Sequence, residues 1–533
     1  MAVDASMAEI AAGAAELEDG LFDAVREQAE SMIAWARSGD ALAAEHHVLE
    51  ERGMTDAMEL ARLLAQAHLD LRALREERRD EVIDEDGGRR VTCEDGQARG
   101  RVMIFGDVTT SRMAYRKRGK PNLYPQDAEL NWGPRCYSAG IERRLAEAIA
   151  VMPAERAAAQ VSRMGAVTVG KRQAEETAEA YAADFEGFYA ARLPAPCPDG
   201  HAVLLTCDGS AFTVLPSALR PATAKAAAVR AKAKEEEGWP DDPGELRKSR
   251  KRTAELAAVA DIPPAPRVPE DILAALFRTA RPGKDEDAGE KAPKPEGPKA
   301  QGKTLFASAA RPAADVIADA FAEAHRRDPE HGRPWIAVID GNCHQIETVR
   351  RLATEYQVKV TILIDLIHVT QYLWKAAGSF FYPAEPAARD WVREQTAKIL
   401  DGKHRDVRAG IRRRATAFGF RGTERAGADE CARYLENKQD YLDYPEFLSA
   451  GWPVASGLIE GAARWLIKDR MEITGARWSL DGAEAVLKLR ALVGCGDFDD
   501  YAEYHLRQEK LRNHDSRYQR SPAPATEALP VAA

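Results

Sequence analysis

The sequence predicts a mixed α/β protein, and three stretches carry that prediction. Two short apolar runs, at residues 336–339 and 360–364, each precede an aspartate and are joined by a segment with helical spacing, the pattern of a β-α-β unit. A third apolar run, at 202–207, ends on Asp208. Strands this apolar are typically buried on both faces of a sheet, with helices covering them. The rest of the chain is dominated by apolar residues at helical spacing.

The strands ahead of the β-α-β unit are predicted to form the antiparallel part of the same sheet. The stretch HAVLLTCDGSAFTVLP, from His201, contains two apolar runs about Asp208 and Gly209, and an Asp-Gly pair in that position predicts a β-hairpin. A third strand is expected within 247–262, although its alanines also allow a helix. The expected order is therefore β-β-β-α-β-α-β, with three antiparallel strands followed by parallel ones.

Composition divides the chain into six regions. Helical amphipathic spacing marks the first, for which we expect a small bundle or an oligomerisation arm. A Pro-, Lys- and Glu-rich stretch has too little apolar surface to order itself and predicts a flexible loop. The regions are 1–88 (helical), 89–195 (DNA-binding, with a small β element and a possible helix-turn-helix), 196–374 (first part of the sheet core, with the flexible loop at about 281–302), 375–452 (helical insertion), 453–495 (final part of the core) and 496–533 (polar helix and disordered tail).

Charge and cysteine content exclude several classes of protein. The net charge of −10 argues against a protein that binds nucleic acid over its whole surface, although basic residues form local clusters. The seven cysteines never form a C-x-x-C pair, which argues against a disulfide framework or a zinc knuckle. No apolar run reaches the ~20 residues of a membrane-spanning helix, and the amino terminus lacks a signal-peptide pattern. We expect a cytoplasmic, nucleoid-associated protein without membrane contact.

Three acidic residues are candidates for a catalytic site. Asp208 and Asp340 end apolar strands, and Glu460 lies in the first turn of a predicted helix. Taken singly, Asp208 could serve a turn and Glu460 could favour its helix dipole. Together, the three carboxylates match the hard-oxygen ligands that Mg²⁺ prefers, with Mn²⁺ as a substitute. Two such ions could activate the attacking oxygen and stabilise the leaving oxygen of a phosphodiester.

Asp365 and His368 form a second pair of candidate residues at a strand end. Either Asp365 replaces Asp340 as a metal ligand, or Asp365 orients the His368 ring through a hydrogen bond beside the site. We favour the second interpretation. Asp340 is followed by Gly341, which would let a phosphate approach closely, whereas Asp365 precedes an apolar segment that looks half buried.

Basic residues near these acids are candidates for DNA contacts. If the helix of Glu460 continues, Arg464 and Lys468 lie on the same face, four and eight residues later. Two predicted helices, separated by a break at Met164 and Gly165, have the spacing of a helix-turn-helix. The same spacing is equally compatible with two helices that simply pack together. The complete set of candidate DNA-binding residues is Arg464, Lys468, Arg470, Arg477, Arg247, Lys248, Arg250, Lys251, Arg252, Lys171 and Arg172.

Several long stretches resemble a known family. They are GDVTTSRMAYR, TCDGSAFTVLPSALRPAT, RKRTAELAAVADI, RRDPEHGRPWIAVIDGNCHQ, ILIDLIHVTQYLWKAA, YLDYP and GWPVASGLIEGAARWLIKDRMEITGARWSLDGAEAVLKLRAL. On these stretches the chain, from about Arg101 to Tyr518, resembles bacterial insertion-sequence transposases of the DDE type, specifically the ISKra-four group.

The resemblance implies a fold, an activity and a set of residues. The fold would be a ribonuclease-H-like mixed sheet core with a helical insertion. The activity would be metal-dependent cleavage of double-stranded DNA at terminal inverted repeats and strand transfer into target DNA, by a homo-oligomer. By position, the resemblance carries the acidic triad to Asp208, Asp340 and Glu460, and a C/D-x-x-H motif to Asp365 and His368.

Two alternatives and one departure from the family pattern accompany this expectation. Relatives often have paired cysteines ahead of the GDVT-like run, whereas this chain has only Cys93 there, which puts a zinc-bound module in doubt. An inactive or domesticated DNA-binding regulator would keep the basic surfaces and lose metal binding. A hydrolytic ribonuclease-H-like nuclease would use the same carboxylates without strand transfer.

Overall fold

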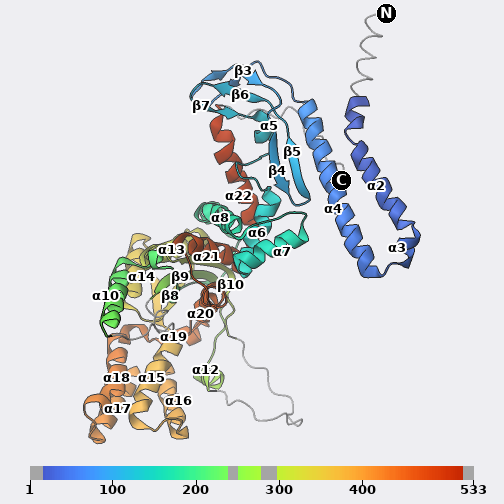
Figure 1. The fold of residues 1–533 in the computed structure, drawn as a ribbon. Coiled ribbons are helices and arrows are strands. Elements are labelled where there is room, and N and C mark those ends of the chain that lie inside the picture. The colour runs from blue at the N-terminus through green and yellow to red at the C-terminus, as the bar shows by residue number, and fades with distance from the viewer. Residues whose placement is uncertain (1–15, 238–249, 278–296, 474, 520–533) are drawn as a thin grey trace, which may run out of the picture. The chain divides into compact units, whose positions relative to one another are not determined.

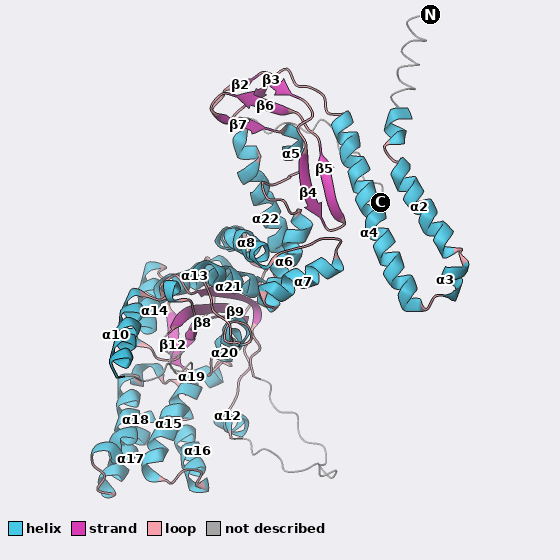
Figure 2. Cartoon of the chain, viewed as in Figure 1, coloured by secondary structure: helices cyan, strands magenta, loops and turns pink. Residues whose placement is uncertain are grey.

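The computed structural model describes residues 16–237, 250–277, 297–473 and 475–519, and these residues form two units (Figure 1). The first unit contains the described residues up to Phe188 and those from Asp497 onward. The second unit runs from Tyr189 to Gly496. Helices and strands occur in both units (Figure 2), so the prediction of a mixed α/β protein is confirmed.

The first unit begins with helices, as its amphipathic spacing predicted, and continues with small sheets. Helix α2 packs along α4, and three antiparallel sheets follow with the orders β1-β2, β3-β6-β7 and β4-β5. The elements are α2 (Asp23–Ala36), α3 (Gly39–Ala43), α4 (His46–Leu74), β1 (Val82–Ile83), β2 (Arg89–Arg90), β3 (Thr92–Glu94), β4 (Arg99–Met103), β5 (Gly106–Thr110), β6 (Ala114–Lys117), β7 (Lys120–Leu123), α5 (Pro125–Glu129), α6 (Ala139–Val151), α7 (Ala154–Met164), α8 (Lys171–Tyr181) and α9 (Phe185–Ala191).

A glutamine side chain joins α4 to the edge of one of these sheets. The Gln66 amide donates to the Thr109 carbonyl at 2.8 Å, and its oxygen accepts from the Thr109 N–H at 2.8 Å. The side chain therefore bonds β5 in the way that another strand would. This pairing satisfies edge-strand groups that would otherwise be open to a neighbouring chain.

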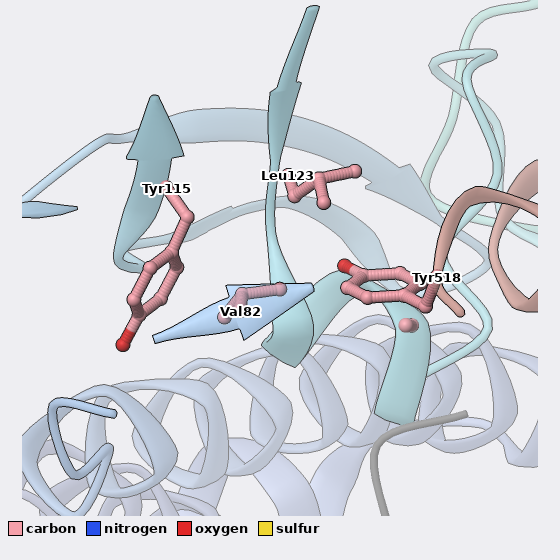
Figure 3. Close-up of a cluster of buried hydrophobic side chains, with 5 residues drawn as sticks. Val82, Tyr115, Leu123 and Tyr518 are labelled. Atoms are coloured by element: carbon pink, nitrogen blue, oxygen red, sulfur yellow. The ribbon is translucent and has the colours of Figure 1, made fainter. Parts of the chain in front are cut away.

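The carboxyl-terminal part of the chain returns to the first unit. Helix α22 (Phe498–Asn513) packs against α6, and Tyr518 lies in a buried apolar cluster with Val82, Tyr115, Leu123 and Ala128 (Figure 3). The Gln519 N–H also donates to the Ile83 carbonyl at 3.2 Å. From the sequence we expected only a polar helix here, because the partners of Tyr518 are at least 390 residues away. The expected tail at 520–533 lies outside the described residues.

The second unit is built on one five-stranded mixed sheet with the order β10-β9-β8-β11-β12. Strands β8 and β9 are antiparallel, as are β9 and β10, whereas β11 is parallel to both β8 and β12. The strands are β8 (Ala202–Thr213), β9 (Lys251–Ile262), β10 (Gln301–Ser308), β11 (Trp335–Ile339) and β12 (Val360–Ile364). The predicted order of three antiparallel strands followed by parallel ones is confirmed, and the strand expected within 247–262 is β9. The two strands predicted on either side of Asp208 are instead one strand, β8, and the remaining antiparallel strand is β10.

The predicted hairpin at Asp208 and Gly209 is wrong. Strand β8 runs straight through both residues, because β9 pairs with it along its whole length, from Ala202 opposite Ile262 to Thr213 opposite Lys251. Continuous pairing outweighs the local turn preference of Asp-Gly. The third strand is β10, which begins within the predicted flexible loop; residues 281–296 of that loop lie outside the described residues.

Helices cover the sheet and extend beyond it. Helices α13 and α14 pack against the sheet, as do α20 and α21, while α16 to α19 fill the tract for which we expected a helical insertion. Among the described helices, none combines the length and apolarity needed to cross a membrane. The bounds are α10 (Pro221–Glu237), α12 (Pro269–Leu276), α13 (Ala313–Arg327), α14 (Cys343–Glu355), α15 (Leu366–Phe380), α16 (Pro386–Leu400), α17 (His404–Ala417), α18 (Ala426–Asn437), α19 (Tyr444–Ser449), α20 (Gly457–Ala463) and α21 (Leu480–Cys495).

Removing the Tyr518 side chain is expected to destabilise the first unit. The Tyr518→Ala substitution deletes a ring that is 7% exposed, and losses of this kind cost about 3 kcal/mol. Calorimetry should show a lower midpoint for one unfolding transition. Tyr382→Ala is the matched control, because Tyr382 is 85% exposed in the second unit. Equal midpoints for the two variants would contradict the assignment of Tyr518 to the core.

Candidate active site

Three aspartates lie on adjacent strands of the sheet or directly after them: Asp208 within β8, Asp340 after β11 and Asp365 after β12. The pairing of β8 with β11 ends at Leu205 opposite Ala337, and Asp208 and Asp340 each lie three residues further along. The pairing of β11 with β12 ends at Ile339 opposite Ile364, directly before Asp340 and Asp365. Because neighbouring strands are about 4.8 Å apart, matched positions on them are close neighbours. The sheet therefore brings Asp208 and Asp340 together.

The backbone beside Asp340 is fixed by its neighbours. One Asp340 oxygen accepts from the Asn342 N–H at 2.7 Å, and the Asp340 carbonyl accepts from the Tyr434 hydroxyl at 3.1 Å. Gly341 has a φ of +92°, and a Cβ there would stand 3.0 Å from the Tyr434 hydroxyl. Glycine is thus required by the backbone and by Tyr434, a different reason from the phosphate access that we inferred from the sequence.

Asp365 is fully buried and connects two helices. One carboxylate oxygen accepts from the Ile367 N–H at 2.5 Å and so caps α15. The other accepts from the Ser456 N–H at 2.7 Å and from the Ser456 hydroxyl. The expected hydrogen bond to His368 is wrong: among the described residues, Ile367 and Ser456 are the side-chain partners of Asp365. Asp365 is occupied by structural bonds and does not present a free oxygen to a ligand.

These bonds position Glu460. Ser456 is the N-cap of α20, and its carbonyl accepts from the Glu460 N–H at 3.1 Å. Glu460 lies in the first turn of this helix, as predicted, and its side chain is exposed. Helix α20 packs against β8, the strand that carries Asp208. The chain thus directs a third carboxylate toward the pair at the strand ends.

Electrostatic effects show that these groups share one environment. Burial raises the pKa of Asp208, and the negative charge of Asp340 raises it further. Partial desolvation raises the pKa of Glu460 although its side chain is largely exposed, and the charges of Asp365 and Asp208 add to the effect. His368 and Lys468 act in the opposite direction on the pKa of both residues. The site therefore contains crowded carboxylates with two basic groups beside them.

The carboxylates fit a hard divalent cation by their chemistry. In the described parts of the chain, no three His, Cys, Asp or Glu side chains already stand in the arrangement of a metal site. The pKa values of Asp208 and Glu460 are raised first by burial and then by the negative charge of neighbouring carboxylates, and a bound divalent cation would offset both effects. Asp208, Asp340 and Glu460 are the residues that would hold it.

The helix after Glu460 does not continue as predicted. Helix α20 ends at Ala463, and Arg464–Lys468 form a π-helical segment in which the Asp469 N–H donates to the Arg464 carbonyl at 2.9 Å. A wider π turn breaks the i, i+4 register assumed for the basic residues. Arg464 forms an exposed ion pair with Asp469 at 3.6 Å. The positive charge of Lys468 instead lowers the pKa of both Asp208 and Glu460.

One predicted DNA-binding residue is buried. Arg470 is 4% exposed, and its guanidinium lies 4.8 Å from the centre of the Trp478 ring. Burial lowers the pKa of Arg470 to about 10. The prediction that Arg470 contacts DNA is therefore wrong as the chain stands, because its side chain packs inside the protein. Arg477 is exposed.

The other predicted DNA-binding residues differ in their surroundings. Arg252 donates to the carbonyls of Ala309 and Ala218 at 2.5 and 2.6 Å, so it holds loops together. Lys251 pairs with Glu472 at 3.4 Å, and Arg250 is half-buried. Arg247 and Lys248 lie outside the described residues. The helix-turn-helix candidates are exposed at the start of α8, where Lys171 lies 3.8 Å from Glu175 and Arg172 2.8 Å from Glu176.

Sequence reasoning missed two residues that build the site. Ser456 stands directly before α20, and a serine in that position is a recognisable N-cap signal. Tyr434 stacks on Tyr372 with ring centres 3.8 Å apart and bonds the Asp340 carbonyl. No local signal could have placed Tyr434 there, since 94 residues separate it from Asp340.

Comparison with known proteins adds no family assignment. A scan against protein-family models finds no match for this sequence, and a search of curated proteins finds none. The geometry of the site and the residues that form it therefore carry the functional argument.

Replacing Asp208 by asparagine is expected to stabilise the metal-free protein at neutral pH. The pKa of Asp208 is higher in the folded state than in the unfolded state. Protonation of Asp208 therefore favours the folded state: this contribution to the free energy of unfolding is fully present below the unfolded pKa of about 3.9 and is lost as pH rises through the folded pKa. In chelator at pH 7, Asp208→Asn should therefore melt at a higher temperature than wild type, and the gain should shrink on acidification. Asp390→Asn, at an exposed site in the same unit, is the control. A lower melting temperature for Asp208→Asn would refute the repulsion.

Proposed function

We propose that this protein is a DDE-type transposase with a ribonuclease-H-like core. It would cleave double-stranded DNA at terminal inverted repeats and transfer the freed 3′ end into target DNA. The observation that carries the proposal is the placement of Asp208 and Asp340 on adjacent parallel strands with Glu460 on the helix packed against β8. The mixed sheet, with antiparallel strands followed by parallel ones, supports the same core.

The proposed chemistry assigns a role to each residue. Mg²⁺ or Mn²⁺, held by Asp208, Asp340 and Glu460, would supply an activated attacking oxygen and stabilise the leaving oxygen. Lys468 offers a positive charge beside these carboxylates, where a DNA phosphate would lie. Asp365 fixes the start of α20 through Ser456 and so keeps Glu460 in place. A homo-oligomer bound to two DNA ends would bring both cleavage sites to one target.

Cleavage of DNA that carries the element's ends tests the proposal. We expect nicking with Mg²⁺ or Mn²⁺ and none in chelator, and we expect Asp340→Asn to abolish nicking while end binding and folding persist. Joined products show a transposase, and nicked products without joining show a hydrolytic nuclease. End binding without cleavage under any of these metals would favour a DNA-binding regulator. Undiminished nicking in chelator would contradict the metal-dependent site.

Asp365→Asn separates positioning from metal binding. The substitution keeps an oxygen but weakens the bonds to Ser456, so we expect a lower melting temperature and a reduced rate that is still detectable with Mn²⁺. Asp340→Asn should leave the melting temperature close to that of wild type, because the Asp340 side chain is half-buried and an asparagine oxygen can still accept from the Asn342 N–H. If Asp365→Asn folds normally and is inactive while Asp340→Asn still cuts, Asp365 is the ligand instead.

Lys468 is expected to contact a phosphate, and Arg470 is not. Lys468→Ala should weaken DNA binding in chelator and reduce the slope of log affinity against log salt by about one. Arg470→Ala removes a cation of the same charge from a buried site on Trp478 and should lower stability without changing that slope. Filter binding over a series of salt concentrations measures both. Equal slopes for wild type and Lys468→Ala would exclude the contact.

A further inference from the structure

The first unit contains a cavity of about 270 Å³ that the proposed reaction does not use. Its lining comes from α4, the loop before α6, the end of α8 and α22. The walls are mainly apolar and aromatic, with Leu69, Trp132, Tyr137, Tyr181 and Leu506 among them. Pockets of this size with aromatic walls and few polar groups are typical of small-molecule sites.

The charged residues around the cavity are already paired. Glu142 accepts two hydrogen bonds from Arg135, at 2.6 and 3.0 Å. Glu509 accepts from Arg512 and from Asn513, both at 2.8 Å. Because these carboxylates are already paired within the protein, the cavity does not favour a charged ligand.

One buried histidine beside the cavity keeps an unused nitrogen. His505 lines the cavity and is 1% exposed, and its Nδ1 lies 2.7 Å from an Asp184 oxygen. A carboxylate can only accept, so Nδ1 carries the proton and Nε2 is left as an acceptor. Burial lowers the pKa of His505, which keeps the ring neutral. In the described part of the chain, Nε2 has no hydrogen-bond partner.

A second acceptor that is unpaired within the described residues belongs to Asn131, another residue that lines the cavity. Asn131 lies in the left-handed region, with a φ of +48°, and its amide nitrogen donates to the Leu506 carbonyl at 3.0 Å. That bond fixes the amide so that Oδ1 is the free end, and Oδ1 is buried without a partner among the described residues. Buried polar atoms are nearly always bonded, so each exception calls for an explanation.

We propose that this cavity is a binding site for a small, flat, uncharged aromatic molecule that carries an N–H donor. The aromatic walls provide the contact area for its rings. The unpaired acceptors of His505 and Asn131 select the donor, because a ligand without one leaves them unbonded. The site lies in the first unit, so its test is independent of DNA cleavage in the second.

A pair of probes that differ only in the donor tests this site on the full-length protein. Indole has the N–H, and 1-methylindole does not. By calorimetry we expect indole to bind at least tenfold more tightly than 1-methylindole, and indole should shift the ¹⁵N resonance of His505 Nε2. Equal affinities, or no binding of indole to the folded protein, would overturn the proposal and leave a cavity that holds only water.

Two histidine variants make the test specific. His505→Phe should weaken indole binding at least tenfold and remove the difference between the probes. His514→Phe is the matched control, because His514 is also buried, has no Nε2 partner among the residues that the structure describes, and does not line this cavity. Should His505→Phe fail to fold, Ala65→Leu narrows the cavity without touching His505 and should weaken both probes. Unchanged indole binding by a folded His505→Phe would contradict the assignment.

Discussion

The buried carboxylate of Asp365 binds pieces of chain that are about ninety residues apart. Burying a negative charge is costly unless several donors satisfy it, and here two backbone N–H groups and one hydroxyl do so. The Asp365 N–H also donates to the Ile339 carbonyl at 2.8 Å. One residue thereby joins β11, the start of α15 and the start of α20. These bonds add to the packing of α20 against β8 in holding the helix of Glu460 on the sheet.

The second unit places its two kinds of buried charge in different surroundings. Burial and neighbouring negative charge raise the pKa of Asp208 and Glu460, whereas the fully buried Asp365 has fixed structural partners. Two buried arginines instead stack on tryptophans: Arg470 on Trp478, and Arg490 on Trp465 at 4.2 Å from the ring centre. Arg490 also donates to the Trp465 carbonyl at 3.0 Å. Trp465 belongs to the π-helical segment, so this contact braces an irregular turn next to Glu460. Local strain at a site and rigid packing behind it often occur together.

Features that depend on residues close together in the sequence could be predicted, and features that depend on distant residues could not. The β-α-β unit of β11, α14 and β12 and the position of Glu460 in the first turn of its helix depend on neighbouring residues, and both were predicted. The strand through Asp208 depends on pairing with β9, so the local Asp-Gly signal was misleading. Strand β10 was missed because QGKTLFAS is short and follows a Pro- and Lys-rich stretch. The π turn at Arg464 has no periodic signal, and the i, i+4 rule misplaced the side chains beyond it.

The split of the first unit along the chain has a consequence for protein synthesis. Its amino-terminal part emerges from the ribosome first, but α22 and Tyr518 are translated only after the whole second unit. Part of the apolar surface of Val82 and Leu123 therefore stays uncovered by Tyr518 while more than 300 residues are synthesised. Because domains generally fold as they are completed, the nascent chain would hold a folded second unit while the first is still open. During that interval, chaperones could bind the incomplete first unit, and proteases could degrade chains that terminate before α22 is made.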